Sequence, residues 1–277
     1  MSKQHQVMEN FDLTGKVAIV TGGAGFLGRS HALTLASAGA RVVVADIREQ
    51  AARDVAEEVQ SATGGKCSPR LTDVRDIASV RSMVGATRDQ FGRIDILVNN
   101  AALDPKFDPE HAGEHATAFE DFPLTAWRKA MDVEVTGMFL CAQAVARPML
   151  KARSGVIVNI SSTYGMVGPD QRIYQREGEP KRYKPVTYSV NKAAVLGFTR
   201  YLATYFRGKG IRVNSLTAGG VFAGHDREFE RKYSEKTTLD RMAKKEEISS
   251  ALLFLVSDAS SYMTGANLVV DGGWTAW

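Results

Sequence analysis

The sequence predicts an α/β protein in which a single doubly wound sheet of seven parallel strands carries helices on both faces. Short runs of β-branched residues alternate with longer segments of helical spacing along the chain, which is the pattern of strands joined by crossover helices. The strand candidates are unbroken Val and Ile runs, and such runs indicate burial on both faces. No linker or repeat divides the chain, so we expect residues 1–277 to form one domain, with a flexible N-terminus at 1–13.

Six strong strand candidates and one weaker one make up the predicted sheet. The strong candidates occupy residues 16–21, 41–46, 94–100, 155–162, 211–216 and 267–273, and the weaker one is KCSPRL at 66–71. Helical spacing covers residues 27–38, 49–62, 76–91, 125–152, 186–206 and 246–257. The stretches 103–118 and 166–185 fit neither pattern. Both follow strands, so they should emerge at the carboxyl edge of the sheet, where ligands bind in open α/β folds.

The composition is that of an ordinary globular protein, and it excludes several functions. Hydrophobic residues make up 44% of the chain and charged residues 24%. The net charge is only +4, and no run of like charges forms a stripe for nucleic acid. Neither a signal-peptide core nor an apolar stretch of ~20 residues is present. The two cysteines, Cys67 and Cys141, fit a reducing compartment. We therefore expect a cytoplasmic protein without nucleic-acid or membrane partners.

The stretch TGGAGFLG at 21–28 predicts a phosphate-binding loop. It contains Gly23-x-Gly25-x-x-Gly28 between the first predicted strand and the first predicted helix. Glycine permits the tight turn and the close approach of a pyrophosphate, while the helix N-terminus supplies N–H groups. The alternative is a glycine-rich turn without a ligand. The strand before the loop and the helix after it favour dinucleotide binding.

Asp46 ends the second predicted strand, where a carboxylate accepts hydrogen bonds from the hydroxyls of the adenosine ribose. The same charge repels a 2′-phosphate, so Asp46 favours NAD over NADP. Arg48 follows two residues later and would partly offset that repulsion. The alternative role for Asp46 is to cap the N-terminus of the following helix.

YSVNK at 188–192 places a tyrosine and a lysine four residues apart, on one face of a predicted helix. A free tyrosine is a poor base at neutral pH, and an ammonium held nearby favours its phenolate form. A tyrosine in that setting exchanges a proton with an alcohol while a hydride moves on the other side. Taken alone, however, the spacing also occurs by chance on ordinary helices.

In its full context the sequence resembles the short-chain dehydrogenase/reductase family over nearly the whole chain. The family's motifs occur in the family's order: TGGAGFLG, Asp73 in LTDVRD, NNAA at 99–102, NISS at 159–162, YSVNK, RVNSLTAGG at 212–220 and VVDGGW at 269–274. The resemblance implies a Rossmann fold and an NAD-dependent oxidoreductase that interconverts a secondary alcohol and a ketone on a small molecule. It also implies assembly as a homodimer or homotetramer.

The resemblance assigns a role to each candidate site residue. It implies that Tyr188 is the catalytic acid/base, that Lys192 stabilises the phenolate and holds the nicotinamide ribose, and that Ser162 polarises the substrate oxygen. The alternative for Ser162 is a strand-end hydroxyl bonded to backbone. The residues that it places at the cofactor are Gly22, Gly25, Phe26, Leu27, Gly28, Asp46, Ile47, Asp73, Val74, Asn99, Ala101, Tyr188, Lys192, Gly219 and Val221.

Three positions depart from the family's pattern. Phe26 stands where most members have glycine, and Ala218 stands where a proline is usual. Glu134 occupies the place of an asparagine that holds a water between the lysine and solvent. We count Glu134 among the catalytic candidates, because it would either hold that water or form an ion pair with Lys192.

The spacing between Ser162 and Tyr188 is longer than is usual in the family, and the extra residues form an insertion at 166–185. Its basic residues are Arg172, Arg176, Lys181, Arg182 and Lys184. Such a loop would cover the site and meet an anionic or polyhydroxylated substrate; a solvated insertion is the alternative. We expect the region 222–245 to form a substrate loop, and the charged stretch 229–247 to form a pair of helices over the substrate pocket with a solvated outer face. The insertion resembles a subgroup associated with flagellin modification and surface sugars, which implies a sugar or sugar-phosphate substrate.

Two other functions stay open. The glycine loop also resembles that of nucleotide-sugar epimerases and dehydratases, which retain NAD. The departures at Glu134 and Ala218 are compatible with a nucleotide-binding scaffold that does not turn over. HAGEH at 111–115 matches the H-x-x-E-H pattern of some zinc peptidases. Because a glycine interrupts it and the segment has the character of a loop, we expect no metal site.

Overall fold

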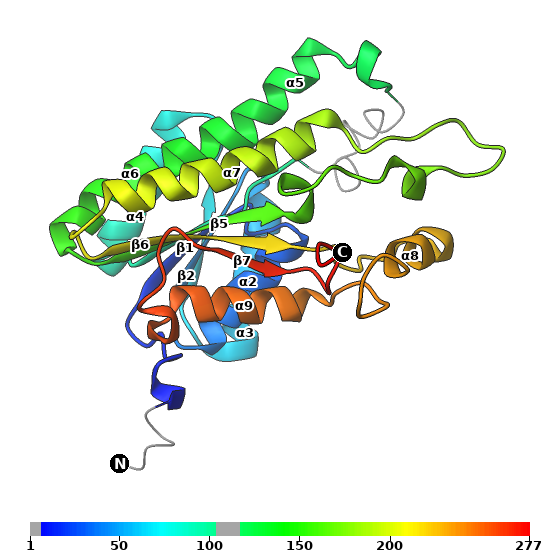
Figure 1. Cartoon of the computed structure of the whole chain (residues 1–277). Helices are drawn as coiled ribbons and strands as arrows, with labels where there is room; N and C mark the ends of the chain where they lie inside the picture. The colour runs from blue at the N-terminus through cyan, green and yellow to red at the C-terminus, as the bar shows by residue number, and fades with distance from the viewer. Residues whose placement is uncertain (1–6, 104–116) are drawn as a thin grey trace.

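The computed structural model describes residues 7–103 and 117–277. These residues form one parallel sheet of seven strands (Figure 1). Its strands are β1 (Val17–Thr21), β2 (Arg41–Asp46), β3 (Cys67–Leu71), β4 (Ile96–Asn99), β5 (Gly155–Ser162), β6 (Ile211–Ala218) and β7 (Asn267–Val270). They lie in the order β3-β2-β1-β4-β5-β6-β7. The order reverses between β1 and β4, and the carboxyl ends of these two strands therefore flank the crevice where such sheets bind ligands. The predicted doubly wound sheet of seven parallel strands is confirmed.

Helices cover both faces of the sheet (Figure 1). One face carries α2 (Phe26–Ser37), α3 (Glu49–Thr63) and α9 (Lys245–Val256), and the other carries α4 (Ile77–Phe91), α6 (Gly137–Ala152) and α7 (Val186–Tyr205). A shorter helix, α5 (Leu124–Met131), runs into α6 through a π-helical turn, η3 (Asp132–Thr136). Helix α8 (Arg227–Ser234) stands apart, beyond the carboxyl edge. No helix within the described ranges has both the length and the apolar character needed to cross a membrane.

The core consists of two apolar layers, one on each face of the sheet. Ala18 and Val20 of β1 belong to the layer beneath α2, α3 and α9. Ile19, between them, belongs to the layer beneath α4, α6 and α7. All three side chains are fully buried, which explains why this strand is continuously apolar rather than alternating.

Apart from small shifts in their bounds, the predicted elements agree with the structure except at three places. The segment 125–152 is α5, a π turn and α6 rather than one regular helix. The weak candidate at 66–71 is a real strand, β3; as the edge of the sheet it tolerates Pro69. Strand β7 stops at Val270, because Gly272 and Gly273 adopt positive φ angles of 65° and 82° that end extended structure.

The expected pair of helices in 229–247 is wrong, because this stretch holds the end of α8 and only the first three residues of α9, Lys245–Glu247. Beyond Ser234 the chain turns instead. Its turns are closed by Thr237, whose hydroxyl oxygen accepts a hydrogen bond from the Arg241 N–H at 3.1 Å and donates to the Ser234 carbonyl at 2.8 Å.

Two residues within the stretch expected to be flexible contact the domain. The carbonyl of Asn10 accepts a hydrogen bond from the Ala259 N–H at 3.1 Å. Leu13 is 2% exposed, and its N–H donates to the Ala38 carbonyl at 2.7 Å. Residues 1–6 lie outside the described ranges.

Exposed aromatic side chains lie on the outer surface of α6 and α7. Phe139 is 45% exposed, Tyr201 64% and Tyr205 50%, and the two tyrosine rings stack with centroids 6.3 Å apart. Apolar surface of this kind favours contact with a partner. The expected homodimer or homotetramer stays a prediction.

A buried histidine between α2 and α9 gives the fold a predictable response to acid. His31 is fully buried, its Nδ1 lies 2.9 Å from Ser249 Oγ, and burial lowers its pKa to about 3. Below pH ~6.5 this histidine is protonated in the unfolded chain, whereas in the folded protein it stays neutral down to about pH 3. The free energy of unfolding should therefore fall with acidification, by up to about 1.4 kcal/mol per pH unit from this group alone. His31→Gln should flatten that slope in urea titrations between about pH 7 and pH 4; an unchanged slope would contradict the assignment.

Candidate active site

The residues singled out in the sequence gather at the carboxyl edge of the sheet, on the right of Figure 1. The predicted cofactor residues follow the ends of β1, β2, β3, β4 and β6. Ser162 ends β5, while Tyr188 and Lys192 stand in the first turns of α7, which packs against β5 and β6. The parallel strands thus bring to one edge groups that are up to two hundred residues apart.

The glycine loop has the close backbone packing that a pyrophosphate cradle needs. Gly22 adopts a φ of +59°, and a Cβ there would stand 2.8 Å from the Ala101 Cα. A Cβ at Gly28 would stand 2.2 Å from the Gly22 carbonyl oxygen. Gly25 is the N-cap of α2, so Phe26 and Leu27 form its first turn, the part of a helix whose N–H groups suit an anion. The conformation therefore depends on Gly22, which precedes the sequence pattern, as well as on Gly23 and Gly28, because a Cβ at Gly23 would stand 2.8 Å from the Val20 carbonyl oxygen.

Asp46 already supports the glycine loop. Its Oδ2 accepts a hydrogen bond from the Ala24 N–H at 3.0 Å, and its Oδ1 accepts from the N–H of Arg48 at 3.0 Å. The carboxylate is 5% exposed, whereas the Arg48 side chain is 58% exposed. Ile47, between them, is 55% exposed, so it presents an apolar surface to a ligand at this edge.

Three further cofactor candidates, Asp73, Val74 and Gly219, follow the carboxyl ends of β3 and β6. Asp73 follows β3, and its hydrogen bonds from Arg75 lower the pKa of its carboxyl group. Val74 is 7% exposed and packs against Gly137, where a Cβ would stand 2.7 Å from Val74 Cγ2. Gly219, after β6, is held against Asp271, since a Cβ there would stand 2.7 Å from the Asp271 Cα.

Two of the candidates at the ends of β4 and β6 are fixed by bonds to neighbouring segments. The N–H of Ala101 donates to the hydroxyl of Thr21 at 3.2 Å, which ties the end of β4 to that of β1. Val221 forms an isolated parallel bridge with Ala243. These contacts fix both residues at the carboxyl edge of the sheet.

Tyr188, Lys192 and Glu134 form the polar centre of the site. Lys192 Nζ lies 5.8 Å from the centroid of the Tyr188 ring and 3.2 Å from Glu134 Oε2. It also donates to the Ile160 carbonyl at 3.4 Å. The two charged side chains are 8% and 4% exposed. Of the two arrangements considered for Glu134, the structure shows the ion pair with Lys192.

Glu134 reaches Lys192 because it stands in the π-helical turn η3. A π turn inserts an extra residue into a helix and redirects one side chain. Asp132 and Glu134 both fall in this turn, and Glu134 is the one buried. Sequence periodicity gave no sign of the π turn, since an acidic residue at this place fits the polar side of an ordinary helix.

A cavity of about 10 Å³ adjoins the pair, lined by Thr21, Asn99, Glu134 and Lys192 among others. This is about the volume that one water molecule needs. Asn99 Nδ2 donates to Asn159 Oδ1 at 2.8 Å, and Asn99 Oδ1 is buried without a partner among the described residues. An unsatisfied carbonyl oxygen next to a charged pair marks this cavity as polar.

The hydroxyl of Ser162 is 7% exposed at the end of β5 and accepts a hydrogen bond from the Tyr164 N–H at 3.3 Å. This bond uses one of the oxygen's lone pairs and leaves the proton for donation. The strand-end role and a role toward substrate are therefore compatible.

An aromatic cluster that the sequence analysis did not identify surrounds Tyr188. The Tyr164 and Tyr188 rings meet edge to face with centroids 6.3 Å apart. Tyr164 also contacts Trp274, which stacks on Tyr233 at 4.2 Å. Tyr174 of the insertion donates from its hydroxyl to that of Tyr164 at 3.2 Å. The only signal in the sequence was the density of tyrosine and tryptophan in segments that are distant from one another.

The insertion is attached to α8 by ion pairs. Arg176 Nη2 lies 2.9 Å from Asp226 Oδ1, and Arg176 Nε lies 3.3 Å from Glu228 Oε2. Lys236 pairs with Asp170 at 2.6 Å. Ile173 is 2% exposed, so the first half of the insertion is packed rather than solvated, whereas residues 177–182 are exposed. Together, the insertion and α8 stand over the carboxyl edge (Figure 1).

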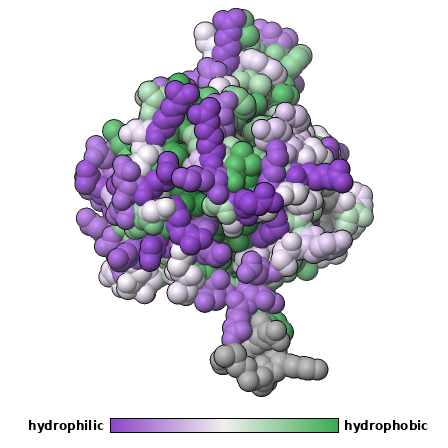
Figure 2. All heavy atoms as spheres, turned by 90° about the vertical axis from the view of Figure 1, so that its left-hand side faces the viewer, coloured by the Kyte–Doolittle hydropathy of each residue, from purple (hydrophilic) through white to green (hydrophobic). Residues whose placement is uncertain are grey.

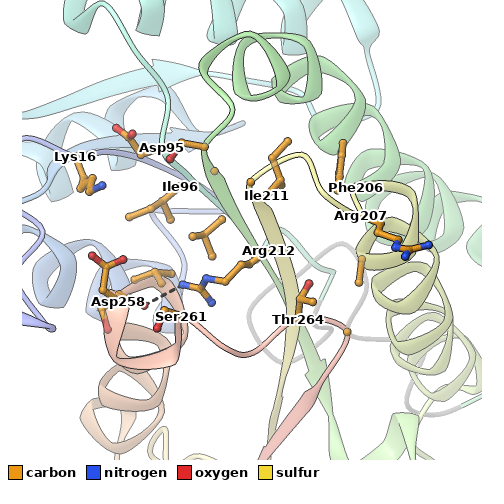
Figure 3. A pocket seen from close by; sticks show the side chains of 18 of the residues that line it. Lys16, Asp95, Ile96, Phe206, Arg207, Ile211, Arg212, Asp258, Ser261 and Thr264 are labelled. Carbon is orange, nitrogen blue, oxygen red and sulfur yellow. Dashed lines mark hydrogen bonds between the residues drawn. The ribbon is translucent and has the colours of Figure 1, made fainter.

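A larger cavity of about 860 Å³ lies at the opposite, amino edge of the sheet (Figure 3). Figure 2 faces this edge and shows a surface that is mostly hydrophilic, with scattered apolar spots. Arg212 reaches across the cavity toward the loop of Asp258 and Ser261. Its guanidinium donates to the carbonyls of Leu255 and Ser257 at 3.0 and 2.9 Å. The guanidinium therefore braces loops, and the cavity contains none of the predicted site residues.

The residues of the H-x-x-E-H pattern, His111 and His115, lie outside the described ranges. The same holds for most of the stretch 103–118. The prediction that no metal site is present therefore stays untested there.

Comparison with known proteins fits this arrangement. The family model described as enoyl-(acyl carrier protein) reductase matches residues 23–275. The chain is 38% identical over 266 residues to the trans-4-hydroxycyclohexanecarboxylate dehydrogenase of Sinomonas cyclohexanicum, covering 94% of this chain and 93% of that one. A short-chain type dehydrogenase/reductase from Mycobacterium marinum superposes with a TM-score of 0.84 and 34% identity over 100% of both chains. A gluconate 5-dehydrogenase from Burkholderia cenocepacia J2315, in complex with NADP and tartrate, gives 0.83 and 29%, covering 98% and 99%.

The chain therefore belongs to the short-chain dehydrogenase/reductase family. It is an oxidoreductase that acts on CH–OH groups with a nicotinamide cofactor. The resemblance drawn from the motifs is confirmed at this level.

Proposed function

We propose that this protein is an NAD(H)-dependent dehydrogenase that interconverts a secondary alcohol and a ketone on a sugar, a sugar phosphate or another polar substrate. The observation that carries the proposal is the ammonium of Lys192, held between Glu134 and the Ile160 carbonyl, 5.8 Å from the Tyr188 ring. The names of two similar proteins, trans-4-hydroxycyclohexanecarboxylate dehydrogenase and gluconate 5-dehydrogenase, support a polar secondary alcohol.

The cradle formed by Gly22 and Gly28 fits a dinucleotide, since any side chain there would collide with backbone. In this proposal the first turn of α2 holds the pyrophosphate and Asp46 holds the adenosine ribose. Asp73, Val74, Asn99, Ala101, Gly219 and Val221 line the groove between the adenine and nicotinamide ends. The bound nicotinamide supplies the hydride acceptor or donor.

The chain's own residues handle the proton. The phenolate oxygen of Tyr188 takes the proton of the substrate alcohol, and in the reverse direction the hydroxyl gives it to the carbonyl oxygen, as a general base and acid. Lys192 places its positive charge beside that phenol and would hold the nicotinamide ribose. Ser162 donates its hydroxyl proton to the same substrate oxygen. The proton is available because the hydrogen bond from the Tyr164 N–H uses only a lone pair of the Ser162 hydroxyl. The aromatic cluster excludes water from these groups.

The preference for NAD over NADP is assigned to Asp46. The carboxylate is buried beside the glycine loop, where a 2′-phosphate would meet its negative charge. Arg48 is the residue through which the chain would accept NADP, because its guanidinium is exposed beside Asp46. The gluconate 5-dehydrogenase structure contains NADP, so the two cofactors need a direct comparison.

Titration with NADH and NADPH, followed by nicotinamide fluorescence, tests this assignment. The wild-type protein should bind NADH more tightly. Asp46→Ser should weaken NADH binding about tenfold to a hundredfold, because a hydrogen bond to a charged group contributes about 1.5–3 kcal/mol. Binding of NADPH should improve in the same variant, and Asp54→Ser, on the exposed surface of α3, serves as control. Tighter NADPH binding by the wild type would reverse the cofactor assignment, and binding of neither would refute the proposed function.

A further inference from the structure

A second lysine, Lys184, stands directly over the ring of Tyr188. Its Nζ lies 3.7 Å from the ring centroid, closer than the ammonium of Lys192. Lys184 is the last residue of the insertion before Pro185, which precedes the first turn of α7. The insertion therefore supplies a cation at the predicted catalytic tyrosine.

The position of Lys184 is fixed from within the insertion. Its N–H donates to Gln171 Oε1 at 2.8 Å, and Gln171 Nε2 donates back to the Lys184 carbonyl at 3.5 Å. Gln171 itself belongs to the short 3-10 helix that contains Tyr174. This two-way contact holds the backbone of Lys184 beside α7, so the ammonium is aimed by the fold and is not at the end of a loose loop.

The positive charge of Lys184 is not neutralised by the acidic residues around the site. Asp170, Asp226 and Glu228 are all in ion pairs with other basic residues of the insertion and α8. Within residues 7–103 and 117–277, no carboxylate forms an ion pair with Lys184. An ammonium carries three N–H donors, and the ring of Tyr188 lies on only one side of the Lys184 ammonium. Donors therefore remain beside the tyrosine for a ligand.

Next to the Tyr188 ring, the structure places the Lys192–Glu134 ion pair and a cluster of uncharged aromatic side chains. Tyr164, Tyr233 and Trp274 are buried and in ring contact with one another or with Tyr188. Burial raises the pKa of the Tyr164 and Tyr233 phenols, which keeps both neutral. An apolar wall beside a cation that has no ion-pair partner among the described residues is suited to a ligand that combines a hydrocarbon skeleton with a single negative charge.

We propose that Lys184 binds a carboxylate of the substrate, and that the enzyme acts on compact hydroxy acids and the corresponding keto acids. This inference rests on the proposed function, because it takes Tyr188 as the group that exchanges the proton with the carbinol. Since the ammonium lies over the ring of that same tyrosine, the carboxylate and the carbinol are only a few bonds apart. Lys184 is thus a specificity-determining residue, supplied by the insertion.

The proposal predicts a preference for charge that can be measured without knowing the natural substrate. The full-length protein is first titrated with NADH. Its NADH complex is then titrated calorimetrically with cyclohexanecarboxylate and with cyclohexanecarboxamide, an uncharged ligand of similar shape. We expect the wild type to bind the carboxylate at least about tenfold more tightly than the amide, as a charge-assisted hydrogen bond provides. Lys184→Gln should abolish the preference and Lys184→Arg should keep most of it.

Lys181→Gln is the matched control, because Lys181 is an exposed lysine of the same insertion. This substitution should leave the preference for the carboxylate unchanged. Equal binding of the two ligands by the wild type, no binding of the carboxylate, or a preference that persists in Lys184→Gln would overturn the proposal. If the wild-type protein did not bind NADH at all, that result would instead overturn the proposed function. A general disturbance of folding in Lys184→Gln would weaken NADH binding and both ligands alike, so it is distinguishable from loss of the charge preference.

Discussion

Tyr188→Phe is expected to lower kcat by about 10²–10⁴-fold, which is the usual contribution of a general acid/base. The phenyl ring keeps the contacts of Tyr188 with Tyr164 and with the ammonium of Lys184. Only the hydroxyl that exchanges the proton is lost, so the dissociation constant for NADH should change little. The measurement is steady-state turnover of a polar secondary alcohol with NAD, together with fluorescence titration of NADH.

Tyr201→Phe provides the control for that experiment, because Tyr201 is on the same helix but is 64% exposed. Removal of the Tyr201 hydroxyl should leave both turnover and NADH binding at the wild-type level. Retention of the full rate by Tyr188→Phe would refute the assignment of the proton to Tyr188. Loss of NADH binding in the same variant would show that the tyrosine acts on the cofactor instead of the substrate.

The second large effect concerns the buried pair of Lys192 and Glu134. Both side chains are less than 10% exposed, and their charged atoms are 3.2 Å apart. Removing one partner leaves the other charge buried without compensation, which costs about 3–5 kcal/mol in comparable cases. Lys192→Met and Glu134→Met should each lower the free energy of unfolding by about this amount, as measured by urea denaturation.

The double variant distinguishes an ion pair from two independent contributions. With both charges replaced by methionine, the desolvation of an unpaired charge disappears, and stability should return most of the way to the wild-type value. Strictly additive losses in the double variant would mean that the two charges do not interact. Activity should stay low in Lys192→Met and in the double variant, because the positive charge beside Tyr188 is absent from both.

The fold was largely predictable because its signals are local. The inner strands β1, β2, β4, β5 and β6 are largely buried on both faces, so their Val and Ile residues form runs that a short window detects. The glycine loop was equally visible, since its glycines form a short pattern and Gly28 packs against the backbone of Gly22 and Gly23 in the same loop. The errors lie where no local signal exists. The π turn at 132–136 depends on a single extra residue, and the chain after Ser234 depends on hydrogen bonds made by Thr237.

The candidate site was predicted in its motif residues and missed in its surroundings. Ser162, Tyr188 and Lys192 could be named because a helical spacing and the order of the family motifs singled them out. The aromatic cluster could not, because Tyr164, Tyr233 and Trp274 come from separate segments whose meeting depends on the sheet and the loops beyond it. For the same reason the basic residues of the insertion looked alike in the sequence.

The sequence by itself determined the parallel sheet, the dinucleotide loop and the tyrosine–lysine pair, since periodicity and short spacings encode all three. Only the tertiary structure decided how the charges are distributed around that pair. It buries Glu134 against Lys192, uses Arg176 to join the insertion to α8, and holds Lys184 over the Tyr188 ring without an ion pair to any carboxylate of residues 7–103 and 117–277. The physical reason is that an ion pair depends on distances of a few ångströms between segments far apart in the chain, and folding alone sets those distances.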